Sequence, residues 1–231
     1  MRVLTLIFVF LISIQNISGQ TDTDSTAVDN KYREDQFYIS TTYNLLGNKP
    51  SGVSQRGFST GFHLGFIRDM PINERRNFAI GLGIGVSSNS YNNNILVSED
   101  NQGVNYTLID DTDASFSRNK LTTYLIEVPL EFRWRTSTST VYKFWRIYTG
   151  FKFGYVVYNT TKFRGSLGNI DTSGISDVNR IQYGITLSAG YSTFNFHLYY
   201  SLNNIFKDEA KLNDQTIGIN AVKIGLIVYI L

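Results

Sequence analysis

The sequence predicts an all-β fold, and within that class an eight-stranded antiparallel transmembrane β-barrel of the outer-membrane type. Three features of the 231 residues support this prediction. Apolar and polar residues alternate along about eight segments, which is the pattern of strands with one apolar and one polar face. The connections between segments alternate between long and short. Aromatic residues make up 14% of the chain, and aromatic side chains favour strands.

The clearest alternation is in residues 124–135, "YLIEVPLEFRWR". Every second residue from Tyr124 to Trp134 is apolar or aromatic, and the residues between them include four charged ones. A strand with this pattern has an apolar face and a charged face. In a transmembrane barrel the apolar face contacts lipid and the charged face points inward. The alternative is a soluble lipocalin-like barrel, in which the apolar face would point inward.

The chain begins with a predicted signal peptide, residues 1–20. One arginine precedes an apolar run that is shorter than a membrane-spanning helix, and small and polar residues follow it. Residues 21–34 are polar and without periodicity, which predicts a flexible periplasmic leader. The barrel is expected to occupy residues 35–231.

Eight alternating segments follow in order, each long enough to cross a bilayer as a tilted strand of about 9–11 residues. The first three have bulky apolar residues on one face, and in the third the opposite face is rich in glycine. The fifth and sixth segments also have aromatic or aliphatic residues on one face, with glycine and polar residues on the opposite face. The predicted segments are 36–46, 57–68, 77–91, 124–135, 143–158, 180–191, 194–206 and 216–231.

The connections give the predicted topology. After odd-numbered segments they are about 10, 32, 21 and 9 residues long, and after even-numbered segments about 8, 7 and 2. Outer-membrane barrels have long loops outside the cell and short periplasmic turns. We therefore expect the protein in the outer membrane of a Gram-negative bacterium, with both termini periplasmic and membrane lipid around its wall.

The inward charges are the first candidate site. An eight-stranded barrel has an interior just wide enough for side chains, and inward glycines leave room for long charged neighbours. We expect a paired polar network that fills the barrel, with a conducting pore as the alternative. Its predicted members are Glu127, Glu131, Arg133, Arg135, Arg146, Lys152, Arg180 and Lys223.

Other classes of site have weak support. The chain has no cysteine, which excludes disulfides and thiolate metal sites. The two histidines, His63 and His197, fall on inward strand positions without a recognisable catalytic constellation. The glycines of residues 81–85 lack the spacing of a phosphate-binding loop, and the acidic residues 98–103 and 110–113 match no known calcium loop. We expect no enzyme activity, no cofactor and no metal.

The near-neutral charge without the signal peptide also argues against a nucleic-acid partner. A second candidate site is the predicted short turn before the fifth segment, where cations flank an aromatic pair. It is interpreted either as an interfacial aromatic belt with snorkelling cations or as a docking surface for partners. The residues assigned to this possible docking surface are Ser137, Val141, Lys143, Phe144 and Trp145.

Residues 124–155 resemble the PorT family of Bacteroidetes outer-membrane barrels. The family's E-[VI]-P-[LV] strand is similar to Glu127–Leu130, and its G-x-K-x-G-Y motif is similar to Gly150–Tyr155. Residues 190–206 resemble the penultimate hairpin of the same family. The resemblance implies a part in the type IX secretion system, an export machinery linked in some species to gliding motility. It implies no catalytic residues.

Two functions are therefore expected as alternatives. The first is a non-enzymatic subunit that supports protein export with other type IX secretion components. The second is a general small barrel for envelope integrity or surface adhesion, acting through its long loops. An outer-membrane enzyme is a more distant third.

Overall fold

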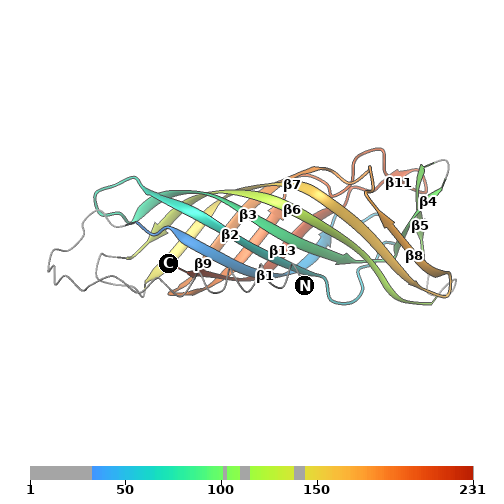
Figure 1. Cartoon of the computed structure of the whole chain (residues 1–231), viewed down its shortest axis with the longest axis horizontal. Coiled ribbons are helices and arrows are strands. Elements are labelled where there is room, and N and C mark those ends of the chain that lie inside the picture. The colour runs from blue at the N-terminus through green and yellow to red at the C-terminus, as the bar shows by residue number, and fades with distance from the viewer. Residues whose placement is uncertain (1–32, 101–102, 110–114, 138–143, 231) are drawn as a thin grey trace, which may run out of the picture. The chain divides into compact units, whose positions relative to one another are not determined.

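The computed structural model describes residues 33–100, 103–109, 115–137 and 144–230. Eight long strands form a closed antiparallel barrel, in which each strand pairs with the next and the first pairs with the last. The strands run obliquely along the barrel (Figure 1). They are β1 (Gln36–Gly47), β2 (Thr60–Pro71), β3 (Phe78–Asn92), β6 (Phe116–Arg135), β7 (Trp145–Gly165), β9 (Ile181–Tyr191), β10 (Phe194–Ser201) and β13 (Asn220–Ile230).

Five short strands belong to the long connections at one end of the barrel. β4 and β5 form a hairpin between β3 and β6, and β11 and β12 form another between β10 and β13. β8 pairs with the last residues of β7. Their bounds are β4 (Ile95–Asp100), β5 (Gly103–Leu108), β8 (Gly168–Ser173), β11 (Lys211–Leu212) and β12 (Gln215–Thr216). In the part of the chain that is described, no helix has the length and hydropathy that a membrane crossing requires.

The outer wall of the barrel is apolar and its interior polar. On β6 the side chains at Tyr124, Ile126 and Val128 are exposed, whereas Leu125 and Glu127 between them are buried. The same alternation holds along the other long strands. A wall of exposed aliphatic and aromatic side chains requires an apolar solvent, which is the environment of a membrane barrel.

Aromatic side chains mark the two edges of this apolar wall. Tyr124 and Tyr158 lie with their ring centroids 6.0 Å apart toward the long-loop end, and Trp145 and Tyr191 lie 5.4 Å apart at the short-turn end. From Tyr124 to Trp134 the strand rises about 34 Å, or about 26 Å along the barrel axis at a tilt of about 40°. This height matches the roughly 25 Å apolar band of an outer-membrane barrel.

The strands differ from the predicted segments mainly at the long-loop end. β6 begins at Phe116 instead of 124, and β7 continues to Gly165 instead of 158, because these strands go on pairing beyond the membrane. The predicted strand ends at 206 and 216 are wrong. β10 ends at Ser201 and β13 begins at Asn220, so this long-side connection spans residues 202–219 instead of the predicted 207–215. Its apolar residues, including Ile205 and Phe206, are buried in the barrel mouth instead of extending the wall.

Candidate functional site

The barrel interior holds three groups of side chains, stacked from the short-turn end to the long-loop end. The group nearest the short-turn end, which we call the inner cluster, centres on Asp69 of β2. This side chain is fully buried. Arg135 donates Nη1 to Oδ1 and Nη2 to Oδ2 of Asp69, each at 2.8 Å, and Arg133 donates Nη1 to Oδ1 at 3.1 Å. Such bidentate, charge-assisted bonds are strong and geometrically specific.

Glycine makes this pairing possible across the intervening strand. β3 lies between β2 and β6, and Gly81 is the β3 residue opposite both Asp69 and Glu131. A Cβ atom at Gly81 would lie 2.6 Å from Nε of Arg133. The inward glycine therefore leaves the volume that the guanidinium group occupies, as the sequence pattern predicted.

Two glutamates complete the inner cluster. Glu131 accepts a hydrogen bond from Nε of Arg133 at 3.0 Å. Glu34 is buried, its carbonyl accepts a bond from Nη1 of Arg133 at 3.4 Å, and its amide donates to Oδ2 of Asp69 at 3.4 Å. The prediction that Glu34 ends a flexible leader is therefore wrong, because this residue is held inside the short-turn end of the barrel. Arg33, the preceding residue of the predicted leader, is exposed. The signal peptide and residues 21–32 of the leader lie outside the described residues.

Arg146 lies beside this cluster and is held by aromatic rings. Its Cζ is 4.5 Å from the ring centroid of Phe144 and 5.6 Å from that of Tyr229. A cation over an aromatic face is stabilised by the ring quadrupole. Among the described residues, Nε and Nη1 of Arg146 have no hydrogen-bond partner.

The middle group centres on Glu127 of β6. Its carboxylate accepts a hydrogen bond from Ser87 at 2.8 Å, lies 3.1 Å from Nδ1 of His63, and forms an ion pair with Lys152 at 3.4 Å. All four residues are buried. A buried charge without such partners is costly, so the carboxylate and its neighbours stabilise one another only as a set.

Lys223 and His197 lie on the opposite side of the interior. Nζ of Lys223 is 4.7 Å from the ring centroid of Tyr199, and Nδ1 of His197 is 2.8 Å from the hydroxyl of Ser188. Ser188 and His197 are both buried, at 2% and 3% exposure. A serine and a histidine enclosed in this way are out of reach of a substrate.

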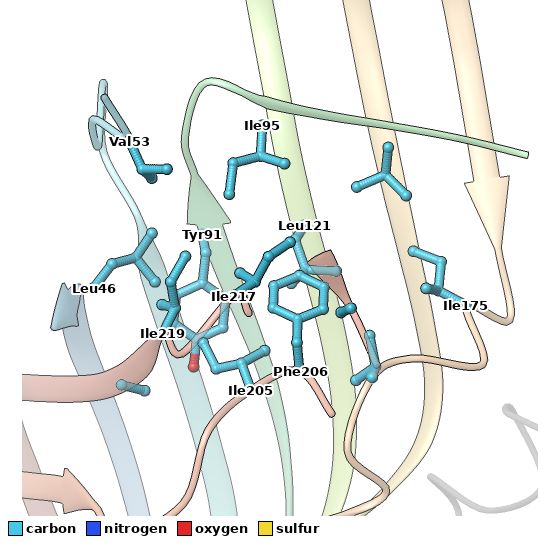
Figure 2. Packing of buried hydrophobic residues seen from close by; sticks show 14 of the residues in the cluster. Leu46, Val53, Tyr91, Ile95, Leu121, Ile175, Ile205, Phe206, Ile217 and Ile219 are labelled. Atoms are coloured by element: carbon cyan, nitrogen blue, oxygen red, sulfur yellow. The ribbon is translucent and has the colours of Figure 1, made fainter. Parts of the chain in front are cut away.

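An apolar plug forms the third group and fills the long-loop end of the barrel (Figure 2). Strand residues such as Leu121 meet loop residues such as Phe206 and Ile217, and all of them are at most 7% exposed. Burial of apolar side chains stabilises by about 1.5–3 kcal/mol each. The plug comprises Leu46, Val53, Tyr91, Ile95, Val97, Leu121, Leu125, Val156, Ile175, Val178, Ile205, Phe206, Ala210, Leu212, Ile217, Ile219 and Ala221.

Hydrogen bonds between different long connections stabilise the packing over the plug. Tyr106 of β5 donates its hydroxyl to Asp177 at 3.1 Å, and Thr172 of β8 donates to the carbonyl of Val97 at 3.4 Å. Burial and the Asp177 carboxylate raise the pKa of the Tyr106 hydroxyl, so it remains a donor. The long connections are thus folded across the barrel mouth.

The predicted interior network is placed in the barrel except at one position. Glu127, Glu131, Arg133, Arg135, Arg146, Lys152 and Lys223 are at most 5% exposed. Arg180 is exposed, so its predicted inward position is wrong. It has the parity of inward residues in β9 but precedes the first residue of that strand, where alternation no longer sets its direction.

The predicted docking surface is only partly exposed. Trp145 is 61% exposed, whereas Phe144 is 2% and Ser137 4% exposed. Phe144 is buried under Arg146, so the prediction that Ser137 and Phe144 are available to a partner is wrong. Val141 and Lys143 lie outside the described residues.

Several members of the interior were missed from sequence. Asp69 forms ion pairs with both Arg133 and Arg135, yet it lies one residue beyond the predicted second segment. Extending the alternation of that segment would have placed it inward. The part of the plug that comes from loops, such as Ile205, Phe206 and Ile217, gave no period-two or period-3.6 signal. Among described residues, no group of three or more acidic or histidine side chains is arranged to hold a metal ion.

A closed eight-stranded antiparallel barrel with an apolar wall, two aromatic belts and a polar interior defines the class of small outer-membrane barrels. The family model described as "Outer membrane protein beta-barrel domain" matches residues 18–207, and the chain belongs to this family. The outer membrane is therefore its location. No curated protein matches the chain. A solved structure titled "Asymmetric conductivity of engineered proteins" aligns with 86% of this chain and 100% of its own, at 7% identity and a TM-score of 0.21, which is too low to carry an argument.

Proposed function

We propose that this barrel is a non-enzymatic outer-membrane subunit that supports protein export by the type IX secretion system, an apparatus that also serves gliding motility in some species. The observation that carries the proposal is the filled interior. Ion pairs around Asp69 and Glu127 occupy the barrel, and the apolar plug covers its mouth. A barrel of this size has no room for a translocating protein, since open aqueous channels need about 16 strands.

A role in export must therefore use the outside of the barrel. The PorT resemblance of residues 124–155 falls on the β6–β7 hairpin, which is also the longest in the barrel. We place the long connections outside the cell and the termini in the periplasm, following the rule for outer-membrane barrels. The short-turn end, with exposed Trp145, would then face periplasmic and membrane components of the secretion machine.

A deletion strain tests this function directly. We expect type IX substrates to accumulate in the periplasm while other outer-membrane proteins assemble normally. A photo-crosslinker at Trp145 is expected to capture a secretion component, whereas the same crosslinker at Leu167, exposed at the opposite end, is the matched control. Normal secretion in the deletion strain would refute the proposal, and a large steady conductance of the purified barrel would refute the filled interior.

A second candidate function is envelope integrity or surface adhesion. The observation that favours it is the ordered packing of the β4–β5 and β11–β12 hairpins over the mouth, which presents a fixed loop surface. This function predicts normal secretion in the deletion strain together with sensitivity to detergents or loss of surface attachment. The two phenotypes separate the candidates.

A further inference from the structure

A ladder of cations lies on the outer face of the β6–β7 hairpin, beyond the tyrosine belt. A bulge at Val157 shifts the register between Tyr124 and Leu125, so that the even-numbered residues of β7 point outward from Tyr158 onward. Outward pairs then follow one another up the hairpin. They are Tyr124 with Tyr158, Thr122 with Thr160, Lys120 with Lys162, and Arg118 with Arg164.

Two of these cross-strand pairs bring like charges together. Lys120 is directly opposite Lys162, and Arg118 is directly opposite Arg164. Like charges at opposed positions destabilise a sheet. Asp171 of β8 binds Arg164 through both carboxylate oxygens, and it is also the cross-strand residue opposite Lys162. Within the described part of the chain, Arg118, Lys120 and Lys162 form no ion pair within 4.0 Å, so a single aspartate stands beside four neighbouring cations.

Arg180 adds a further cation on the other side of β7. It is exposed, and with Tyr155 and Tyr158 it lines a cleft of about 160 Å³ between β7 and the start of β9. The cleft exists because β7 leaves β9 after Tyr155 and pairs with β8 from Thr160 onward. Arg180 thus lies beside Tyr158, and Lys120 and Lys162 lie beyond this tyrosine along the hairpin. We call these three cations the cation arc.

The height of the cation arc relates it to the membrane. Arg180 lies at the level of the tyrosine belt, since its neighbour Ile181 pairs with Tyr155. Lys120 and Lys162 are four residues beyond the tyrosines, which is about 14 Å along the strand and about 10 Å along the barrel axis. The polar headgroup zone extends roughly 5–8 Å beyond the hydrocarbon core, and lysine stems reach down toward it.

We propose that the cation arc binds the phosphate groups of a phosphorylated lipid headgroup in the leaflet at the long-loop end. The occupant is a lipid because the arc is continuous with the lipid-facing wall, so acyl chains lie directly below the cations. Phosphate supplies the further negative charge that this excess of cations attracts, and cations near a membrane surface are drawn to anionic headgroups. With the orientation given under the proposed function, this leaflet is the external one.

Binding can be measured with the full barrel in detergent micelles, using lipid A as the probe. We expect native mass spectrometry to show that the wild-type protein retains lipid A more tightly than the same lipid after removal of its phosphates. The variant Lys120→Ala/Lys162→Ala/Arg180→Ala should lose about tenfold or more in affinity, since each lost contact is charge-assisted. The conservative Lys120→Arg/Lys162→Arg variant should retain binding.

A matched control removes three exposed cations elsewhere, in Arg68→Ala/Lys207→Ala/Lys211→Ala, and should bind as the wild type does. Heat-modifiability gels verify that each variant is folded. Equal binding of both forms of the lipid, or an equal loss in the control variant, would overturn the proposal. Displacement of the lipid by an equimolar amount of inorganic phosphate would show a free-anion site and would also overturn it.

Orientation is tested separately. The chain has no native cysteine, so Ser166→Cys at the tip of the β7–β8 hairpin gives a single site for a membrane-impermeant thiol reagent. Labelling on intact cells supports the external leaflet. Labelling of Glu74→Cys in the β2–β3 turn instead would refute the orientation in the proposed function, but it would leave the detergent binding assay as an independent test of the cation arc.

Discussion

Arg135 of β6 donates two parallel hydrogen bonds of 2.8 Å to Asp69 of β2, across the intervening strand β3. Both side chains are fully buried. This relationship predicts that Asp69→Ala destabilises the barrel by about 3–5 kcal/mol, because it leaves the charges of Arg135 and Arg133 without their shared counter-ion. Urea unfolding in lipid vesicles measures the loss. Arg68→Ala, which removes an exposed cation 3.9 Å from Asp35, should cost only about 0–1 kcal/mol.

The Glu127 cluster is expected to behave as a coupled unit. Glu127→Ala leaves Lys152 and His63 buried without their carboxylate and should also cost about 3–5 kcal/mol. The double variant Glu127→Ala/Lys152→Ala should be less destabilised than the sum of the single variants, since the second change removes the unpaired charge. Strict additivity in a double-mutant cycle would contradict the ion pair. Glu99→Ala, on an exposed loop strand, serves as the neutral control.

The position of the aromatic belts predicts a depth dependence along β6. Leu130 lies midway between the belts, and Leu130→Arg should cost about 2–4 kcal/mol. Ile126 lies one outward position from Tyr124, so Ile126→Arg should cost only about 0–1 kcal/mol. The free energy of unfolding in vesicles measures both. A larger loss at Ile126 than at Leu130 would contradict this placement in the membrane.

The apolar plug should be sensitive to truncation. Phe206→Ala is expected to cost about 3–5 kcal/mol of local stability, because it removes a buried ring and leaves a cavity. Hydrogen exchange of the β11–β12 hairpin should accelerate while that of the barrel strands is unchanged. Leu167→Ala, at an exposed site in the same part of the molecule, should change neither. Uniform acceleration over the whole barrel would show that the plug and wall unfold together.

The pair of Arg164 and Asp171 gives a prediction about pH. The hydrogen bonds from Arg164 hold the pKa of the Asp171 carboxyl below its usual value. A depressed folded-state pKa contributes stability above the unfolded-state pKa, and this contribution is lost as the pH falls through the folded value. Carboxyl-carbon NMR of Asp171 should follow this titration, and Arg164→Ala should return the pKa toward its usual value. An unchanged pKa in the variant would contradict the pairing.

The strands could be predicted from sequence wherever one face of a strand contacts lipid and the other faces the polar interior. Glu127 and Ile126 differ in polarity because one faces the interior and the other lipid, so period two is visible without a structure. The same rule failed for Ile205 and Phe206, whose consecutive burial in a loop follows no strand period. It also failed for Arg180, which has the right parity but lies outside the strand.

The sequence showed which charged residues point into the barrel more clearly than it showed which of them form ion pairs with one another. Arg133 and Arg135 were recognised as inward, but the partnership with Asp69 depends on the register of β2, β3 and β6 together. That register determines which charge sits beside which glycine, and a single chain does not reveal it. The burial of Glu34 was invisible for the same reason, since its contacts with Asp69 and Arg133 join residues that are distant in sequence.

The seam between β1 and β13 has a consequence for how the barrel is made. Phe37 pairs with Ile230 at one end of this seam and Gly47 with Asn220 at the other, so the final ladder joins the two extremes of the barrel sequence. Contacts between such distant residues carry a high loop-closure entropy and make folding slow. Until the last strand has been delivered, the free edges of β1 and β10 present unpaired backbone groups. A chaperone or an assembly machine that shields these edges would therefore determine the yield of this protein more than its final stability does.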